Sequence, residues 1–131
     1  LQYGVNQCNV QDIIVCGHYE CGGVRAALAA TKDAGAPLQT WLANVRQVYT
    51  RHEKELDAIE DPSDRYRRFV ELNVIEQCIN VFKFSVVQSR REESFLEGEM
   101  VPRVHAMIFD PSSGDLKRIP FDFSEYSEGK Q

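Results

Sequence analysis

The sequence predicts one α/β domain over residues 1–131, with a largely parallel sheet flanked by helices and with more helix than strand. The first observation is the apolar run at residues 13–16, which does not alternate with polar residues. Such a run predicts a strand buried on both faces, as in a parallel sheet covered by helices. The second is helical spacing of apolar residues from about 38 to 90, and the third is an alternating strand pattern at 101–109. A chain of this length suits a single domain with a modest core.

The elements before residue 60 follow from local patterns. Residues 1–8 predict the end of a helix, with Asn9 as a left-handed stop. A strand follows at 10–17 and a helix at 24–30, which Gly35 and Pro37 terminate. The next helix is expected over residues 38–59, because its apolar side chains keep a helical spacing on one side. These side chains are Trp41, Leu42, Val45, Val48, Tyr49 and Leu56.

The second half predicts a long helix and a hairpin. Residues 61–63 (Asp-Pro-Ser) carry capping residues and a proline for the first turn, so a helix should begin there and run to about Arg90. Residues 101–109 then predict a strand and 110–114 a turn. A returning strand is expected at 116–119, and residues 121–131 are expected to form a surface tail.

Composition and charge narrow the class of function. The formal net charge is −5, which argues against a nucleic-acid partner, because such proteins need a concentrated basic face. The basic residues at 65–68 are flanked by acidic ones and are interpreted as a solvated helix face. No run of about 18 apolar residues occurs, so we expect no membrane partner.

The cysteines favour a reducing compartment. The chain has four, Cys8, Cys16, Cys21 and Cys78, and it is neither short nor rich in cysteine. Cys8 and Cys78 lie among apolar helical positions, where a thiol behaves as a small hydrophobe. We therefore expect a cytoplasmic protein. A mitochondrion stays open as the alternative, because the chain does not start with Met and a targeting sequence could precede it.

A histidine and a cysteine three residues apart are the residues that point to chemistry. His18 and Cys21 follow the first predicted strand, and a nitrogen and a sulfur ligand at the end of a strand are typical of a zinc site. Gly17 precedes them, and Gly22 and Gly23 follow. These glycines let the backbone turn and let a small ligand approach. Zinc needs at least three protein ligands, however, and this motif supplies two.

Other candidate ligands are weaker. Cys16 lies two residues before His18 on the same side of an extended strand, so it would not converge with Cys21 around one metal ion. A buried thiol is the favoured interpretation of Cys16. His52 lies in a charged helical stretch and is expected to be solvated, whereas His105, beside Arg103 on a strand, is expected to have a structural or surface role.

The segment 13–28, IIVCGHYECGGVRAAL, resembles the β-class carbonic anhydrases. The resemblance continues at residues 41–46 (WLANVR) and 71–74 (ELNV), at Gln77 and Asn80, and at Val104, His105, Asp110 and residues 114–116. It implies the fold of that family and a zinc enzyme that interconverts carbon dioxide and bicarbonate. In the family, two cysteines and one histidine hold zinc, and a water molecule takes the fourth place, where zinc lowers its pKa.

The resemblance also assigns individual positions. His18 and Cys21 match the second and third zinc ligands, and Gly22 matches a residue whose backbone can face bicarbonate. The family's first zinc cysteine comes from an upstream C-x-D-S-R motif, which also supplies an Asp–Arg pair. No cysteine precedes Cys8, and Asp12 is not followed by Ser-Arg, so no catalytic residue is identified. The resemblance does not extend to the family's N-terminal helices, which embrace the partner subunit.

Three hypotheses follow from this departure. The chain is the C-terminal part of a longer carbonic anhydrase, or a naturally minimal member, or a non-catalytic module for assembly or regulation. Because an exposed edge on a hydrophobic strand invites pairing with another chain, we also expect a homodimer or a higher homo-oligomer.

Overall fold

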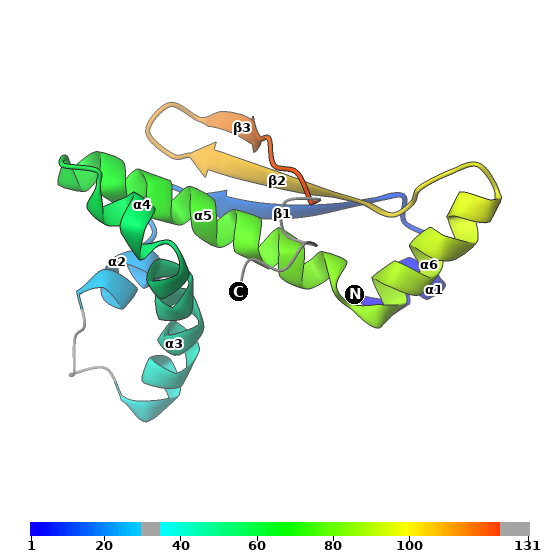
Figure 1. The fold of residues 1–131 in the computed structure, drawn as a ribbon, viewed down its shortest axis with the longest axis horizontal. Helices are drawn as coiled ribbons and strands as arrows, with labels where there is room; N and C mark the ends of the chain where they lie inside the picture. The colour runs from blue at the N-terminus through cyan, green and yellow to red at the C-terminus, as the bar shows by residue number, and fades with distance from the viewer. Residues whose placement is uncertain (30–34, 124–131) are drawn as a thin grey trace.

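The computed structural model describes residues 1–29 and 35–123. Two short helices and a strand come first, and longer helices separate this strand from a C-terminal hairpin (Figure 1). The elements in chain order are α1 (Gln2–Asn6), β1 (Asp12–His18), α2 (Gly22–Leu28), α3 (Ala36–Arg51), α4 (Glu53–Asp57), α5 (Pro62–Phe82), α6 (Ser85–Leu96), β2 (Arg103–Asp110) and β3 (Asp115–Ile119).

The three strands form one sheet in the order β1-β2-β3. β1 and β2 are parallel, with Ile14 opposite His105 and His18 opposite Phe109. β3 returns antiparallel to β2 through the turn between Asp110 and Asp115. The α/β class is therefore confirmed. The sheet consists of the parallel pair β1 and β2 and of the antiparallel strand β3, which corresponds to the returning strand expected at residues 116–119.

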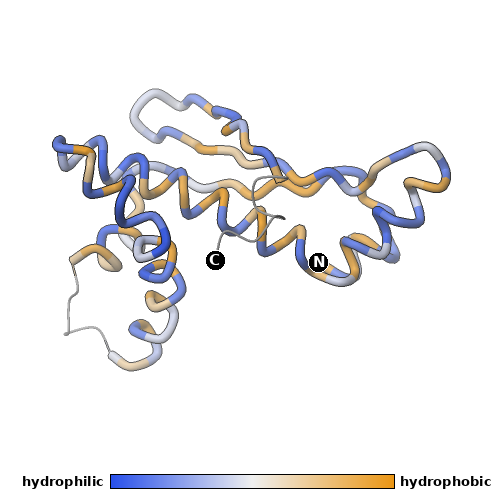
Figure 2. Tube along the Cα trace, in the orientation of Figure 1, coloured by the Kyte–Doolittle hydropathy of each residue, from blue (hydrophilic) through white to orange (hydrophobic). Residues whose placement is uncertain are grey.

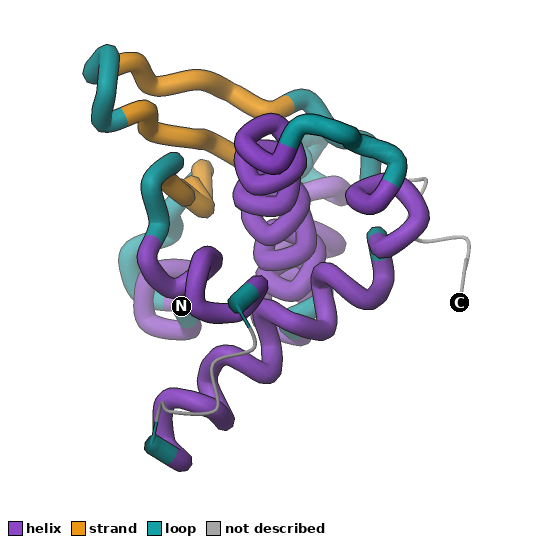
Figure 3. The backbone as a smooth tube through the Cα atoms, turned by 90° about the vertical axis from the view of Figure 1, so that its left-hand side faces the viewer, coloured by secondary structure: helices purple, strands orange, loops and turns teal. Residues whose placement is uncertain are grey.

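α5 is the helix that packs along the sheet, as Figures 1 and 3 show from two directions. Hydrophobic residues follow the middle of β1 and β2 and recur along α5 (Figure 2). The predicted alternation in β2 is confirmed, because Val104, Ala106 and Ile108 are buried in the same core as Phe69 and Leu72 of α5. This interface fixes the position of β1, whose last residue is His18.

The prediction that the first strand is buried on both faces is wrong. Along β1, exposed and partly buried residues alternate. Ile13 and Val15 pack against the core, whereas Ile14 is 58% exposed and Cys16 is exposed. The reason is that β1 forms an edge of the sheet, and no helix among the described residues covers the face opposite α5. The prediction of a buried thiol at Cys16 is wrong for the same reason.

Both long helices that the sequence predicts are shorter in the structure. The helix expected over 38–59 stops at Arg51, where His52 leaves helical geometry and its imidazole contacts the Glu76 carboxylate at 3.1 Å. The helix expected to reach Arg90 stops at Phe82, because Phe84 adopts an extended conformation. The predicted cap at the start of α5 is confirmed, since Asp61 accepts hydrogen bonds from the first backbone N–H groups.

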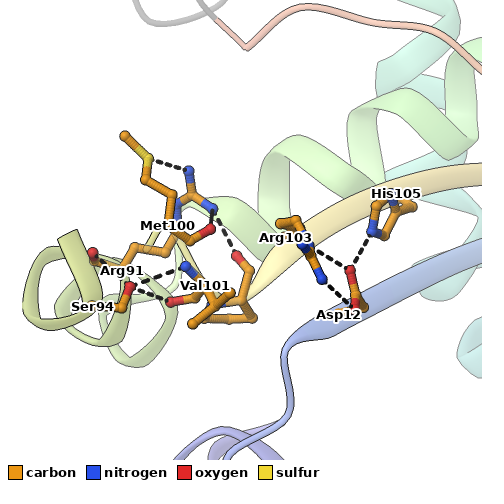
Figure 4. Close-up of polar contacts among 8 residues, drawn as sticks. Asp12, Arg91, Ser94, Met100, Val101, Arg103 and His105 are labelled. Atoms are coloured by element: carbon orange, nitrogen blue, oxygen red, sulfur yellow. Dashed lines mark hydrogen bonds and ion pairs between the residues drawn. The ribbon is translucent and has the colours of Figure 1, made fainter. Parts of the chain in front are cut away.

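A buried serine holds the connection between α6 and β2 (Figure 4). Ser94 is fully buried, and its Oγ accepts a hydrogen bond from the Val101 N–H at 3.0 Å. Arg91 donates to the carbonyl oxygens of Met100 at 3.1 Å and Pro102 at 2.7 Å. These bonds satisfy the backbone of the turn that leads into β2.

Both ends of the described chain can be compared with the elements expected there. Residues 1–8, expected to be the end of a helix, contain the helix α1 at Gln2–Asn6, and Asn9 has the left-handed φ of 50° predicted for the stop. Within the expected surface tail, Phe121 and Phe123 are partly buried, and Phe123 stacks on Phe82 with ring centroids 4.2 Å apart. Residues 124–131 lie outside the described residues. No helix in the described chain has the length and hydropathy needed to cross a membrane.

Candidate metal centre

His18 lies at the end of β1 with one ring nitrogen available. Its Nδ1 is 2.8 Å from the carbonyl oxygen of Tyr19. A carbonyl oxygen only accepts hydrogen bonds, so Nδ1 carries a proton, which makes Nε2 the bare nitrogen of the neutral imidazole. Histidines that bind metals commonly donate their other ring N–H to a backbone carbonyl in this way. The His18 side chain is therefore oriented as a metal-binding histidine is.

Cys21 lies at the start of α2, where it occupies the N-cap position. It is a free, partly buried thiol. Its carbonyl oxygen accepts the first hydrogen bond of the helix from the Arg25 N–H at 3.1 Å. The same oxygen accepts the phenol hydrogen of Tyr66, on α5, at 3.0 Å. The backbone of Cys21 is thus held by two hydrogen bonds, whereas its thiol forms no disulfide.

The backbone turn between the two residues falls at Glu20, which has a left-handed φ of 55°. The turn was expected at the glycines, but Gly17 and Gly23 are required for close packing instead. A Cβ at Gly17 would lie 2.3 Å from Cγ2 of Val74, and one at Gly23 would lie 3.1 Å from the Trp41 ring. These glycines permit close packing, whereas Gly22 has no atom within 4 Å of such a Cβ.

Tyr19 is the residue of this segment that sequence reasoning missed. It is 5% exposed, and its hydroxyl donates to Glu71 Oε1 at 2.6 Å. Burial, followed by this hydrogen bond, raises the pKa of Tyr19 to about 12, so the phenol remains a donor at neutral pH. The available signal was an aromatic residue in an otherwise polar loop.

A pair of charges lies behind Tyr19. The Arg67 guanidinium sits over the Tyr19 ring, 3.6 Å from its centroid, and contacts Asp110 Oδ2 at 3.2 Å. Asp110, at the end of β2, is buried and accepts hydrogen bonds from both the N–H and the hydroxyl of Ser112. These bonds, together with Arg67, lower the pKa of Asp110 below its ordinary value.

The prediction of a solvated basic face at residues 65–68 holds only in part, because the side chains of Arg67 and Arg68 are 38% and 36% exposed but are engaged in ion pairs. Arg65 donates to the Ile59 carbonyl at 2.7 Å, and Arg68 contacts Glu55 at 2.6 Å and Glu71 at 3.2 Å. Tyr66 is buried. These residues fasten α5 to its neighbours, which a charge count along the sequence could not reveal.

The other histidines do not join His18. The expected solvation of His52 is wrong, because its side chain is 16% exposed and contacts Glu76. His105 contacts Asp12 Oδ1 at 2.7 Å, and Arg103 donates to both oxygens of the same carboxylate (Figure 4). This cluster lies at the first residue of β1, whereas His18 is the last residue of that strand. The expected structural or surface role of His105 agrees with that position.

The described residues supply an incomplete set of metal ligands. No group of three or more His, Cys, Asp or Glu side chains capable of holding a metal ion occurs within residues 1–29 and 35–123. Cys16, exposed on β1, therefore does not complete such a group with His18 and Cys21. The nitrogen of His18 and the sulfur of Cys21 are ligand types that suit zinc, but they are only two of the three protein ligands that a zinc site needs.

Comparison with known proteins defines the class. The sequence profile of the carbonic anhydrase family matches residues 1–116, and the chain belongs to the β-carbonic anhydrase family. It is 50% identical over 123 residues to a carbonic anhydrase of Emericella nidulans, covering 94% of this chain and 51% of that protein. With a carbonic anhydrase of Candida albicans it shares 28% identity, covering 98% of this chain and 43% of that protein. The chain thus spans about half the length of these relatives.

Solved structures agree with this assignment. One of two tetrameric β-carbonic anhydrases from Sordaria macrospora superposes with a TM-score of 0.78 at 32% identity, covering 92% of this chain and 57% of that one. The β-carbonic anhydrase CafA of Aspergillus fumigatus superposes with a TM-score of 0.79 at 30% identity, covering 97% and 57%. The α/β fold described above is therefore that of β-carbonic anhydrases.

Proposed function

We propose that this chain is part of an enzyme that uses zinc to hydrate carbon dioxide reversibly to bicarbonate, with His18 and Cys21 as two of the zinc ligands. The observation that carries the proposal is the hydrogen bond from His18 Nδ1 to the Tyr19 carbonyl, which leaves Nε2 of the neutral ring bare, three residues before the Cys21 thiol. Membership of the carbonic anhydrase family supports this reaction. Bound zinc would lower the pKa of a coordinated water molecule, so that hydroxide is available near neutral pH to attack carbon dioxide.

Two ligands suit zinc but do not complete a catalytic site, which has three protein ligands and one open position. The third ligand must therefore come from residues outside the described ones. The same holds for the Asp–Arg pair that the resemblance implies. The enzyme activity is proposed for the assembled protein, in which those residues join His18 and Cys21.

Gly22 is proposed as the residue whose backbone faces bicarbonate. It is exposed at the first position of α2, and no heavy atom lies within 4 Å of where its Cβ would be. A small anion can therefore approach this backbone, whereas the Trp41 ring lies close to the neighbouring Gly23.

A second function competes with catalysis. The incomplete ligand set favours a catalytically inactive carbonic-anhydrase-like module that serves oligomerisation or regulation. This hypothesis predicts a stable oligomer with substoichiometric metal and without carbon dioxide hydration. The enzyme hypothesis predicts close to one equivalent of zinc per chain and measurable hydration.

Metal analysis combined with a stopped-flow hydration assay separates the two. Cys21→Ser should abolish zinc binding, because it removes the thiolate and leaves one ligand. Cys8→Ser is the matched control, since Cys8 is an exposed thiol outside the loop and its replacement should leave the zinc content unchanged. Equal zinc content in the wild-type protein and in Cys21→Ser would show that the site assignment is wrong.

A further inference from the structure

We infer that Tyr66 and Glu71, both on α5, are positioning residues that set the placement of His18 and Cys21 for the metal ion. This inference rests on the proposed zinc site. Neither residue touches the metal ligands' donor atoms in the contacts described above. Tyr66 is hydrogen-bonded to the backbone carbonyl of Cys21, and Glu71 is hydrogen-bonded to Tyr19, the neighbour of His18. Both residues belong to the helix that packs along β1.

Tyr66 acts on Cys21 through its peptide group. The buried phenol donates to the Cys21 carbonyl oxygen at 3.0 Å, and the same oxygen accepts the first hydrogen bond of α2. A carbonyl group held from two directions cannot rotate without losing a hydrogen bond. The orientation of this peptide in turn sets the direction in which the Cys21 side chain leaves the backbone. The Arg25 guanidinium lies over the Tyr66 ring, 4.9 Å from its centroid.

Glu71 acts on His18 through Tyr19. Its Oε1 accepts the Tyr19 hydroxyl at 2.6 Å, and its Oε2 is held by Arg68 at 3.2 Å. Tyr19 in turn presents its carbonyl oxygen to His18 Nδ1 at 2.8 Å. The hydroxyl held by Glu71 and the carbonyl oxygen that accepts from His18 belong to one residue, so a shift of Tyr19 as a whole would move the acceptor that orients the imidazole. Glu71 is thus linked to the imidazole through Tyr19, whose hydroxyl donates to Glu71 and whose carbonyl oxygen accepts from His18.

The alternative is that these contacts stabilise the fold and nothing more. The chain contains a matched control for this alternative. Tyr49 on α3 also donates its hydroxyl to a carboxylate, that of Asp57, at 2.5 Å. It packs edge-on against Phe69 and has no contact with residues 18–21 among those described above. Tyr49→Phe removes the same chemical group at a place that leaves the loop untouched.

The first test uses the metal-free protein and amide hydrogen exchange of residues 19–22. Tyr19→Phe and Tyr66→Phe should each accelerate exchange in this segment about fivefold, the size expected for one lost hydrogen bond. Tyr49→Phe should leave exchange in this segment unchanged. Glu71→Gln keeps an acceptor for the Tyr19 phenol and should resemble the wild-type protein, whereas Glu71→Ala should resemble Tyr19→Phe. Unchanged exchange in both tyrosine variants would overturn the inference, whatever the metal measurements show.

The second test measures zinc affinity by competition with a chromophoric chelator. Tyr66→Phe and Glu71→Ala should weaken zinc binding about 10-fold or more, as is usual when a group that orients a ligand is removed. Tyr49→Phe should bind zinc as the wild-type protein does, even if its unfolding temperature falls equally. A loss of affinity that simply follows the loss of stability across all variants would assign these residues a structural role only.

The two proposals fail in different ways. If wild-type protein and Cys21→Ser bind equally little zinc, the proposed function fails for this chain, and the exchange data still decide whether α5 positions the loop. If the wild-type protein binds zinc and the α5 variants match it in both affinity and exchange, the positioning inference fails alone.

Discussion

Gly17 and Val74 approach each other so closely that a Cβ at residue 17 would lie 2.3 Å from Cγ2 of Val74. Val74 is 3% exposed, so its methyl group has little room to move. The contact brings the end of β1 directly against α5, one residue before His18. The distance between β1 and α5, and with it the position of His18, therefore depends on residue 17 being a glycine, which has no side chain.

Gly17→Ala should therefore destabilise the protein by about 1–3 kcal/mol, the usual cost of overpacking a core. Denaturant unfolding measures the effect. Gly22→Ala is the control, because no heavy atom lies within 4 Å of its Cβ position, and it should change stability little. The double variant Gly17→Ala/Val74→Ala should recover part of the loss relative to the sum of the single variants. Strict additivity would contradict the contact.

Ser94→Ala should lower the free energy of unfolding by about 1–3 kcal/mol, since it leaves the buried Val101 N–H without its acceptor. Ser94 is fully buried, and the turn into β2 depends on it. Ser89→Ala, an exposed position on the same helix, should change stability by less than about 0.5 kcal/mol. Equal effects in the two variants would show that the buried hydroxyl does not stabilise the turn.

Acid should weaken the contacts of Asp12. Arg103, and after it His105, hold the pKa of the Asp12 carboxyl well below its ordinary value. A lowered folded-state pKa means that the stabilisation is fully present above the ordinary value near 4 and is lost as the pH falls toward the folded-state value. Asp12→Asn should thus lower the unfolding temperature at pH 7 more than at pH 3. The exposed position keeps the effect small, and added salt should reduce it. A pH-independent difference would contradict this account.

The thiols should differ in reactivity. Cys8 and Cys16 are exposed, whereas Cys78 is fully buried and burial raises its pKa to about 12. Because the thiolate is the reactive species, iodoacetamide at neutral pH should alkylate Cys8 and Cys16 and spare Cys78 until the protein unfolds. Mass spectrometry of the alkylated peptides checks this. Rapid alkylation of Cys78 in folded protein would mean that the core around it opens readily.

Self-association is expected from the uncovered face of the sheet. The register places Ile14, Phe109 and Leu116 on this face, where they are 58%, 40% and 55% exposed. Apolar residues beside an open strand edge favour pairing with another chain. Sedimentation velocity at micromolar concentration should show at least a dimer, and Ile14→Lys should weaken it. A monomeric wild-type protein would contradict the proposal.

The sequence predicted those parts of the fold that local patterns determine. The cap at Asp61, the alternation of Val104, Ala106 and Ile108, and the left-handed Asn9 each depend on neighbours in the chain, and each is confirmed. The helix ends were wrong. His52 leaves its helix where its side chain contacts Glu76, which lies 24 residues further along, and no local pattern contains that contact.

The candidate site divides in the same way. His18 and Cys21 could be proposed from the sequence because they lie three residues apart and have metal-binding side chains. Tyr66 and Glu71 could not, because their contacts with the loop span 45 and 52 residues and their side chains are common on any helix. The exposure of Cys16 depended on which face of the sheet the helices cover, and an apolar run does not encode that.

The open edge of β1 has a consequence for how the active centre would mature. β1 ends at His18, so any strand that adds in parallel to this edge would deliver its own C-terminal residues next to the proposed zinc ligands. Completing the sheet and completing the coordination sphere would then be a single event. If zinc binds as proposed, the zinc content of a preparation would then report how many molecules have been assembled.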